Sequence, residues 1–431
     1  MKPVHMNYNG APETVSTFCF VMYIYFLIDF FLHLSARIPP YALIRPTLLL
    51  VIIISLSLIL QRQKLSTFSG GLPFKSIKIL FAYLVISLPL VEWPGSVVQN
   101  LALLVKAIVF LFFTALIIDT EKRLKVFLFV FVSCQVFRAI EPLFLNLTSG
   151  YWGDKTYLGS GEFANRLAGA PSDVVNPNGL GFVIVTAIPF LHYLLWGAKW
   201  KSKVLYIAIL PAIMYALLLT MSRGAMVAFL VVVWMVFKNS KHKLSLVIVG
   251  LLSAVVMWGV LNDVQKDRYL SLVSSDTQGA KTVDGRWQGM VNEFSLGAER
   301  PIVGHGLGTT GEAKFNSGMK RQAAHNLYAE LLIEIGIIGF IIFIIYIVSI
   351  YNIFIANQNL ISKQSKLKTN SEYDFYNRLN LALTTVFWMY VVYSINYYGL
   401  SVYYWYLFGG LTIAFGRVLQ GKSKFEQGSY D

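Results

Sequence analysis

The chain has 431 residues, of which 56% are hydrophobic and 13% are charged, and its mean hydropathy is +0.60. Because an average soluble domain carries about 25% charged residues, this composition excludes an ordinary cytosolic enzyme and a disordered protein. The formal net charge is +14. In a membrane protein such an excess of basic residues reflects the orientation of the chain and its contact with lipid more often than nucleic-acid binding.

Long apolar segments recur along the whole chain. Crossing the hydrocarbon core takes about 20 apolar residues, and in lipid every backbone group needs a partner within its own segment, so these segments are predicted to be helices. About twelve are expected to span a membrane: 15–33, 42–60, 74–91, 97–118, 124–146, 178–197, 203–221, 224–237, 244–261, 327–351, 380–399 and 402–419. The predicted fold class is an all-α polytopic membrane protein. Cys19 and Cys134 lie inside these segments, which disfavours a disulfide framework and a metal site.

The distribution of Lys and Arg predicts which way the helices run. With the N-terminus in the cytoplasm, the inward loops hold about 21 basic residues. The short outward loops then hold only Arg37, Lys155, Arg166 and Arg223. The positive-inside rule therefore predicts that both termini are cytoplasmic.

Three regions follow from this pattern of spans. Residues 1–261 hold transmembrane helices 1–9, with an outward loop near 147–177. Residues 262–324 form a large outward loop, and 325–431 hold helices 10–12 with a polar cytoplasmic linker near 352–379. A loop as long and polar as the large one is usually functional, and we expect it to contain short helices over the membrane face.

The window 281–340 is the richest in residues suited to chemistry. His325 and Asn326 stand where the large loop enters the next span, and His is the side chain best suited to proton transfer near neutral pH. A His that anchors a helix at the membrane interface is the alternative. The stretch Gly304–Gly308 resembles a phosphate-cradling loop, but no strand precedes it, so a tight turn that needs glycine is favoured.

A second candidate is Arg223, in the short outward turn Thr220–Ala225. A cation at the membrane face costs on the order of a few kcal/mol unless it is paired. Its small neighbours Ser222 and Gly224 favour helix–helix contact, which would point Arg223 into the bundle. The alternative is an arginine that extends to lipid phosphates.

Further charged residues lie near the outward ends of spans. The sequence Asn176–Gly181 signals a turn and a helix start, and Arg138 and Glu141 are predicted to form an i,i+3 ion pair. An accessory role in ligand binding is the alternative for four residues: Arg138, Arg166, Asn178 and Asn326. Other charges within or close to spans each need a partner or a wet cavity: Asp29, Lys106, Glu330 and Glu334.

Arg223, Arg286 and His325 all belong to the outward side on this topology. Two arginines can clamp a diphosphate bidentately, and a histidine beside them can take a proton at the membrane surface. Together they point to a lipid-linked diphosphate substrate, because a neutralised diphosphate is a good leaving group.

At these residues the chain resembles the O-antigen ligase/O-antigen polymerase superfamily of bacterial membrane glycosyltransferases. Ser222–Ala225 resembles the family's Ser-Arg-Gly turn, and Asp284–Trp287 its Gly-Arg-x-x-x-Trp element, except that here the Trp follows the Arg directly. Arg300–Gly308 resembles the Pro-x-x-Gly-x-Gly-x-Gly stretch, and His325–Gly339 the His-Asn element that enters the next helix. The similarity covers about residues 175–340.

The resemblance implies a mostly helical protein of the bacterial inner membrane whose active site faces the periplasm. It implies transfer of a glycan from undecaprenyl diphosphate to a sugar hydroxyl of lipid A–core or of a growing glycan, with no cofactor, metal or nucleic acid. Membrane lipid is the remaining partner. Carried over to this sequence, His325 is the catalytic base, and Arg223 and Arg286 bind the diphosphate.

Several activities remain open. A ligase is favoured slightly, because the intact Arg and His-Asn elements look closest to that branch, and a repeat-unit polymerase of O-antigen or exopolysaccharide is the main alternative. A protein O-oligosaccharyltransferase is a further alternative; it is less favoured because such proteins usually carry extra C-terminal sequence, and here only about a dozen residues follow the last predicted span. A lipid-linked sugar flippase or other transporter is an alternative of a different class, motivated by buried charges in many spans, and a structural scaffold is the third reading.

Overall fold

The computed structural model describes residues 14–66, 68–159, 162–271, 280–367, 373–397 and 399–427. It is 78% helical, which confirms the all-α class. The first half contains α1 (Thr17–Leu32), α2 (Leu34–Arg37), α3 (Pro39–Ala42), α4 (Pro46–Leu60), α5 (Arg62–Leu65), α6 (Gly71–Ile86), η1 (Leu88–Leu90), α7 (Pro94–Ile117), α8 (Glu121–Ser149), β1 (Gly153–Gly159), β2 (Glu162–Leu167), α9 (Pro177–Phe190) and η2 (Leu191–Trp196). The second half contains α10 (Trp200–Leu219), α11 (Arg223–Asn239), α12 (Lys243–Val260), α13 (Asp263–Leu270), α14 (Ala280–Glu299), α15 (Thr310–Asn316), α16 (Leu327–Leu367), α17 (Asp374–Tyr393) and α18 (Tyr403–Gln427).

Every apolar segment predicted from the sequence coincides with one of these helices. Within the described residues, 6 helices are long and apolar enough to cross a membrane: α7, α8, α9 continued by η2, α10, α12 and α16. Two more, α1 and α4, are apolar but shorter. The count of about twelve spans therefore stays a prediction.

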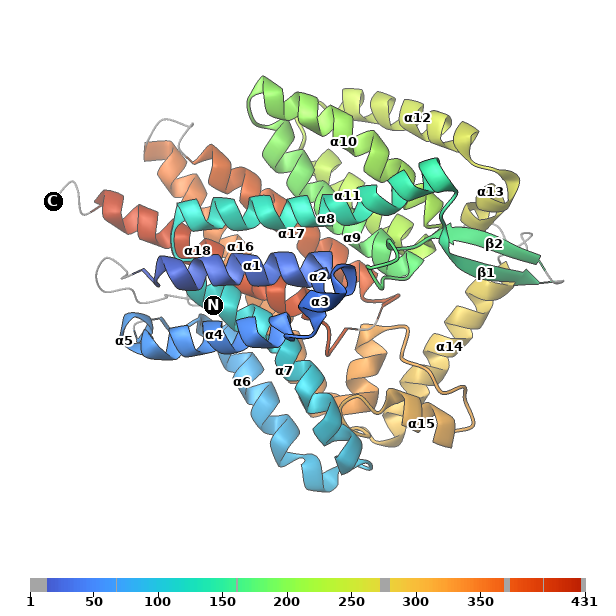
Figure 1. Ribbon diagram of the computed structural model, residues 1–431, viewed down its shortest axis with the longest axis horizontal. Coiled ribbons are helices and arrows are strands. Elements are labelled where there is room, and N and C mark those ends of the chain that lie inside the picture. The colour runs from blue at the N-terminus through green and yellow to red at the C-terminus, as the bar shows by residue number, and fades with distance from the viewer. Residues whose placement is uncertain are drawn as a thin grey trace.

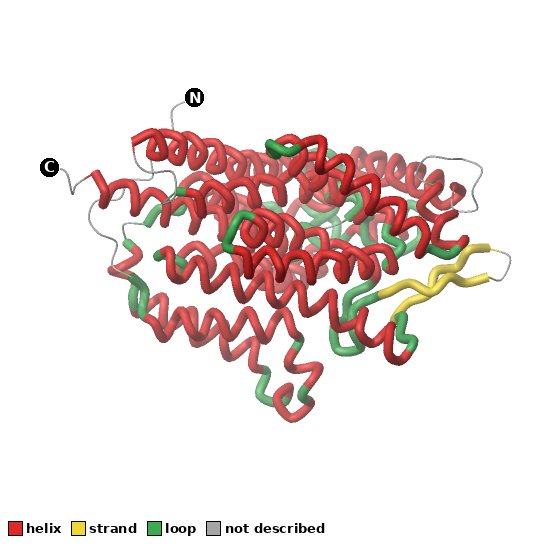
Figure 2. Tube along the Cα trace, turned by 90° about the horizontal axis from the view of Figure 1, so that it is seen from above, coloured by secondary structure: helices red, strands yellow, loops and turns green. Residues whose placement is uncertain are grey.

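The helices gather into one bundle whose two ends differ. In both views the start of α1 and the end of α18 lie at one end of the bundle, and the β1–β2 hairpin projects from the other (Figures 1 and 2). Helices α13 and α14, from the large loop, lie toward the hairpin end (Figure 1). The two segments predicted to face outward therefore share one end of the molecule.

Helix α12 differs from the rest because none of its residues is buried. It is apolar along 18 residues and packs lightly against α11. A helix that is apolar on all sides is stable when lipid covers it, so its exposure supports a membrane environment.

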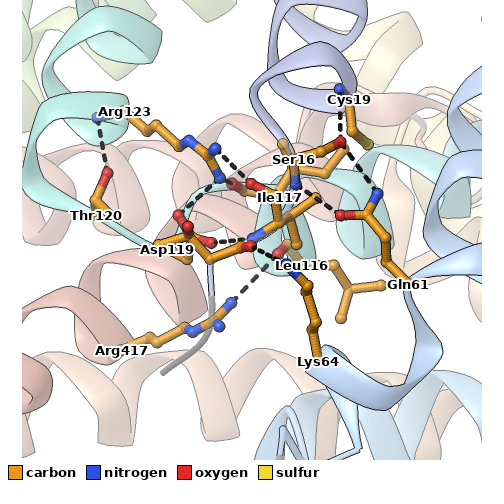
Figure 3. Close-up of polar contacts among 12 residues, drawn as sticks. Ser16, Cys19, Gln61, Lys64, Leu116, Ile117, Asp119, Thr120, Arg123 and Arg417 are labelled. Carbon is orange, nitrogen blue, oxygen red and sulfur yellow. Dashed lines mark hydrogen bonds and ion pairs between the residues drawn. The ribbon is translucent and has the colours of Figure 1, made fainter. Parts of the chain in front are cut away.

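A buried polar cluster holds the beginning of α1 in place (Figure 3). The Arg123 guanidinium donates to Asp119 Oδ1 at 2.9 Å and to the Val15 carbonyl at 2.5 Å, while the Val15 amide donates to Asp119 Oδ2 at 2.9 Å. The Ser16 amide donates to Gln61 Oε1 at 2.7 Å. The cluster thus joins α1, the end of α4 and the α7–α8 connection.

Three parts of the structure differ from the expectation. The segment near 147–177 contains a hairpin in which Gly153 pairs with Leu167 and Thr156 with Ala164. The linker expected near 352–379 is mostly helical, because α16 runs on to Leu367 and α17 begins at Asp374. The large loop does contain helices, but α14 has 20 residues and is not short.

Candidate functional site

The turn between α10 and α11 places Arg223 inside the bundle. Met221 adopts a positive φ of 50°, and the Ser222 side chain caps α11 by accepting a hydrogen bond from the Ala225 amide. Arg223 is then the first residue of the helix and is only 5% exposed. Its Nη1 donates to Ser271 Oγ at 2.8 Å, which favours the expected inward direction over extension to lipid.

Two further arginines converge on the same turn. Arg166 Nε donates to the Thr220 carbonyl at 2.8 Å, and Arg268 Nε donates to the Met221 carbonyl at 2.9 Å. Both side chains are buried, as Arg223 is. We call Arg166, Arg223 and Arg268 the arginine cluster; it gathers positive charge where water is largely excluded, so an anion there would be held strongly.

Sequence reasoning did not single out Arg268. Its position beside the turn depends on α13 folding back against the end of α10, where Tyr269 Oη donates to the Leu218 carbonyl at 2.8 Å. Burial raises the pKa of the Tyr269 phenol above its ordinary range, and the charges of Arg166 and Arg268 oppose that rise. No local sequence pattern predicts that α13 packs against the end of α10.

Asn178 lies next to the arginine cluster. Its Oδ1 accepts a hydrogen bond from Arg166 Nη2 at 2.9 Å, and its carbonyl accepts one from Tyr393 Oη at 2.7 Å. The preceding Asn176 caps α9 with Pro177 in the first turn, which confirms the helix start predicted there. Asn178 therefore orients Arg166.

The predicted ion pair between Arg138 and Glu141 is wrong. Arg138 instead binds Asp173 through Nε at 2.6 Å and Nη2 at 3.0 Å, and both side chains are buried. Glu141 pairs with Arg37 at 2.5 Å. The loop after the hairpin brings Asp173 onto α8, and a two-bond fork to a buried carboxylate is stronger than a contact along a helix surface. Arg138 thus anchors this loop.

His325 stands at the entrance to α16. His325 is exposed, and its backbone amide donates to Glu293 Oε1 at 3.2 Å. Glu293 is buried on α14 and also accepts from Lys314 Nζ at 2.5 Å. Asn326 caps the helix, since its Oδ1 accepts from the Tyr328 amide at 2.8 Å. The backbone under His325 is therefore fixed from two sides, and Glu293 is a positioning residue that the sequence did not reveal.

The starts of α11 and α16 meet at one segment, the turn that follows α17. The Leu327 amide donates to the Ser394 carbonyl at 2.8 Å. On the other side, a Cβ placed on Gly224 would lie 3.3 Å from the Asn396 Cβ. The elements that carry Arg223 and His325, far apart in sequence, thus pack against the same few residues.

Arg286 belongs to α14, the helix that supplies Glu293. Seven residues of helix separate the two positions, which corresponds to about 10 Å along the axis. The side chain of Arg286 lies outside the described residues, so its expected role stays a prediction. The neighbouring Trp287 is exposed.

The glycine stretch is a tight turn, as predicted. Gly304, Gly306 and Gly308 have φ of 73°, 124° and 74°. The amides of this turn bond to α16 where Gly336, with φ of 58° and ψ of −170°, interrupts the helix. The Gly306 amide donates to the Glu334 carbonyl at 3.0 Å, and the Gly308 amide donates to Glu334 Oε2 at 2.7 Å. These donors are used within the protein, so a phosphate-binding role is not supported.

In the part of the chain that the structure describes, no group of three or more His, Cys, Asp or Glu side chains is arranged to hold a metal ion.

Comparison with known proteins found a family model that is similar to part of the chain. The model of the family described as O-antigen ligase matches residues 206–344, the segment from α10 to the first half of α16. A comparison with curated proteins found no match. The family match includes Arg223, Arg286 and His325. It confirms the predicted resemblance and supports a place for this chain in the O-antigen ligase/polymerase superfamily.

Proposed function

We propose that the protein is an O-antigen ligase-type glycosyltransferase. It moves a glycan from undecaprenyl diphosphate to a sugar hydroxyl of lipid A–core at the periplasmic face of the inner membrane. The family match over residues 206–344 supports an activity of the ligase/polymerase kind at a coarse level. The donor, the acceptor and the residues below belong to the proposal.

In the proposed reaction, His325 takes the proton of the acceptor hydroxyl as its oxygen attacks the anomeric carbon of the donor. A new C–O bond forms, the bond from that carbon to the diphosphate oxygen breaks, and undecaprenyl diphosphate leaves. Direct displacement inverts the anomeric configuration. Arg223 and Arg286 stabilise the negative charge that develops on the leaving diphosphate.

The observation that carries the proposal is the arginine cluster beside the start of α11. Preorganised guanidinium groups in a site with little water stabilise a phosphate anion far better than they would in bulk solvent. Arg166 and Arg268 each donate one bond to a backbone carbonyl of the turn, which fixes their direction. The start of α16, with His325, packs against the same segment as Gly224.

The test is a silver-stained gel of lipopolysaccharide from a deletion strain, complemented with wild type or with His325→Ala. We expect the deletion and the His325→Ala strain to make only rough core while undecaprenyl-linked polymer accumulates, with the variant inserted at the wild-type level. A core carrying one repeat unit would identify a polymerase instead. An unchanged ladder in the deletion, or a full ladder with His325→Ala, would overturn the proposal.

A further inference from the structure

A cavity of about 300 Å³ lies between α15 and the first turns of α16, next to the segment that leads into His325. That volume is at the lower end of the range for small-molecule sites, about 300–1,000 Å³. Most of the side chains that line it are polar: Thr310, Glu312, Arg321, Gln322, Glu330 and Glu334. Neither the proposed base nor the arginine cluster uses these side chains.

Two carboxylates form the inner wall of the cavity. Glu330 and Glu334 are one helical turn apart on α16 and are 7% and 5% exposed. Glu334 is fully engaged, since its Oε1 accepts from Thr310 Oγ1 and its Oε2 from the Gly308 amide, both at 2.7 Å. It therefore shapes the wall.

Glu330 is engaged on one side only. Its Oε2 accepts from the Gly399 amide at 2.7 Å and the Leu400 amide at 3.2 Å. Its Oε1 accepts no hydrogen bond from the described residues, and Glu330 lines the cavity. A sugar hydroxyl can both donate and accept, so a hydroxyl that enters the cavity can form a hydrogen bond with this side of the Glu330 carboxyl group.

The exposed residue Arg321, which also lines the cavity, can exchange its present partner for a ligand. Arg321 Nη2 donates to Glu312 Oε1 at 3.1 Å, and their side chains are 67% and 30% exposed. A solvent-exposed pair of this kind contributes little to stability, so an incoming ligand can replace one partner. Arg321 would then donate to oxygens of a ligand in the cavity that Glu330 also lines.

We infer that this cavity binds a sugar unit of the acceptor glycan, an inference that rests on the function proposed above. Sugar hydroxyls donate to carboxylates and accept from guanidinium groups, which matches this lining. The acceptor is favoured over the donor because residues 321–324 line the cavity and His325 follows them directly. Among the described side chains that line the cavity, Arg223, which would hold the donor diphosphate, is absent.

The test is a transfer assay with purified protein in nanodiscs. The donor is the native undecaprenyl-diphosphate glycan, and the acceptor is core oligosaccharide released from the host lipopolysaccharide and deacylated. For Arg321→Ala and Glu330→Gln we expect the KM for the oligosaccharide to rise about ten-fold, the change that loss of one good hydrogen bond produces. The KM for the donor should stay within about two-fold of wild type. Lys320→Ala, an exposed neighbour outside the cavity, is the matched control.

Binding of the same oligosaccharide to His325→Ala protein, measured by calorimetry, separates the two ideas. Adding Arg321→Ala to this variant should weaken binding about ten-fold. If wild type transfers glycan but the cavity variants leave the acceptor KM unchanged or raise the donor KM instead, the inference is overturned while the proposed function stands. If the wild-type protein binds the oligosaccharide through Arg321 yet never transfers, the proposed function fails.

Discussion

At the residue scale, Arg286 allows a direct test of how the diphosphate would be held. Lysine keeps the positive charge but replaces a planar, two-pronged donor with a single ammonium group. If Arg286 binds the diphosphate bidentately, Arg286→Lys should lose most of the transfer activity, on the order of ten-fold or more, because about one strong hydrogen bond is lost. The readout is the ladder on the lipopolysaccharide gel. Gln288→Ala, at an exposed position on the same helix, is the control. A full ladder with Arg286→Lys would show that Arg286 does not bind the diphosphate bidentately.

The buried pair of Arg138 and Asp173 makes a different prediction, about stability. Removing one partner of a buried ion pair leaves an uncompensated charge and costs about 3–5 kcal/mol. We therefore expect Asp173→Ala to lower the thermal unfolding midpoint of the purified protein clearly. Glu141→Ala breaks the more exposed pair with Arg37, which is worth about 0–1 kcal/mol, and should lower it much less. Equal midpoints for the two variants would show that Arg138 does not anchor the loop.

The residues of the candidate site divide by how local their signals are. Arg223 and His325 could be singled out from the sequence because each stands at a span boundary among small or capping residues. Arg268 and Glu293 could not, because their contacts join α13 to the α10–α11 turn and α14 to the start of α16. Arg138 had a plausible neighbour one turn away, and only the folded loop showed that Asp173 binds it instead.

At the element scale, the break in α16 depends on glycine. Gly336 has φ of 58°, and a Cβ there would lie 2.3 Å from the Ile302 carbonyl oxygen. An alanine must therefore displace the Arg300–Gly308 turn as well as adopt a strained backbone. We expect Gly336→Ala to lower the yield of monodisperse protein in detergent several-fold, as followed by size-exclusion chromatography. Gly250→Ala on α12, where nothing lies within 4 Å, should match wild type. A normal profile for Gly336→Ala would show that the turn yields easily.

The helices could be predicted because lipid admits few other structures for long apolar segments. The second half of α16 escaped prediction because its sequence is polar and resembles a linker. In the structure those polar side chains pair between helices: Gln358 Oε1 accepts from Asn380 Nδ2 at 2.9 Å, and Gln364 Nε2 donates to Ser423 Oγ at 2.6 Å. Such pairing depends on neighbours that are distant in sequence, and composition alone cannot indicate it.

At the scale of the whole molecule, the two ends of the bundle carry different kinds of structure. The end that holds the start of α1 and the end of α18 carries the polar cluster around Arg123 (Figures 1 and 3). The opposite end carries the hairpin, α13 and α14 (Figure 1). An asymmetry of this kind agrees with the excess of basic residues in the loops predicted to face inward. It also puts the arginine cluster, which includes Arg166 of the hairpin and Arg268 of α13, toward the hairpin end.

The orientation itself can be tested by cysteine labelling, because Cys19 and Cys134 are buried and should react little. Lys155→Cys lies on the exposed hairpin and Lys241→Cys in the exposed turn before α12. With a membrane-impermeant maleimide, and only the outer membrane opened, we expect the hairpin position to be labelled. The α12 position should react only after the inner membrane is also breached. The reverse pattern would place His325 on the cytoplasmic side, and a periplasmic glycan transfer at this site would then be impossible.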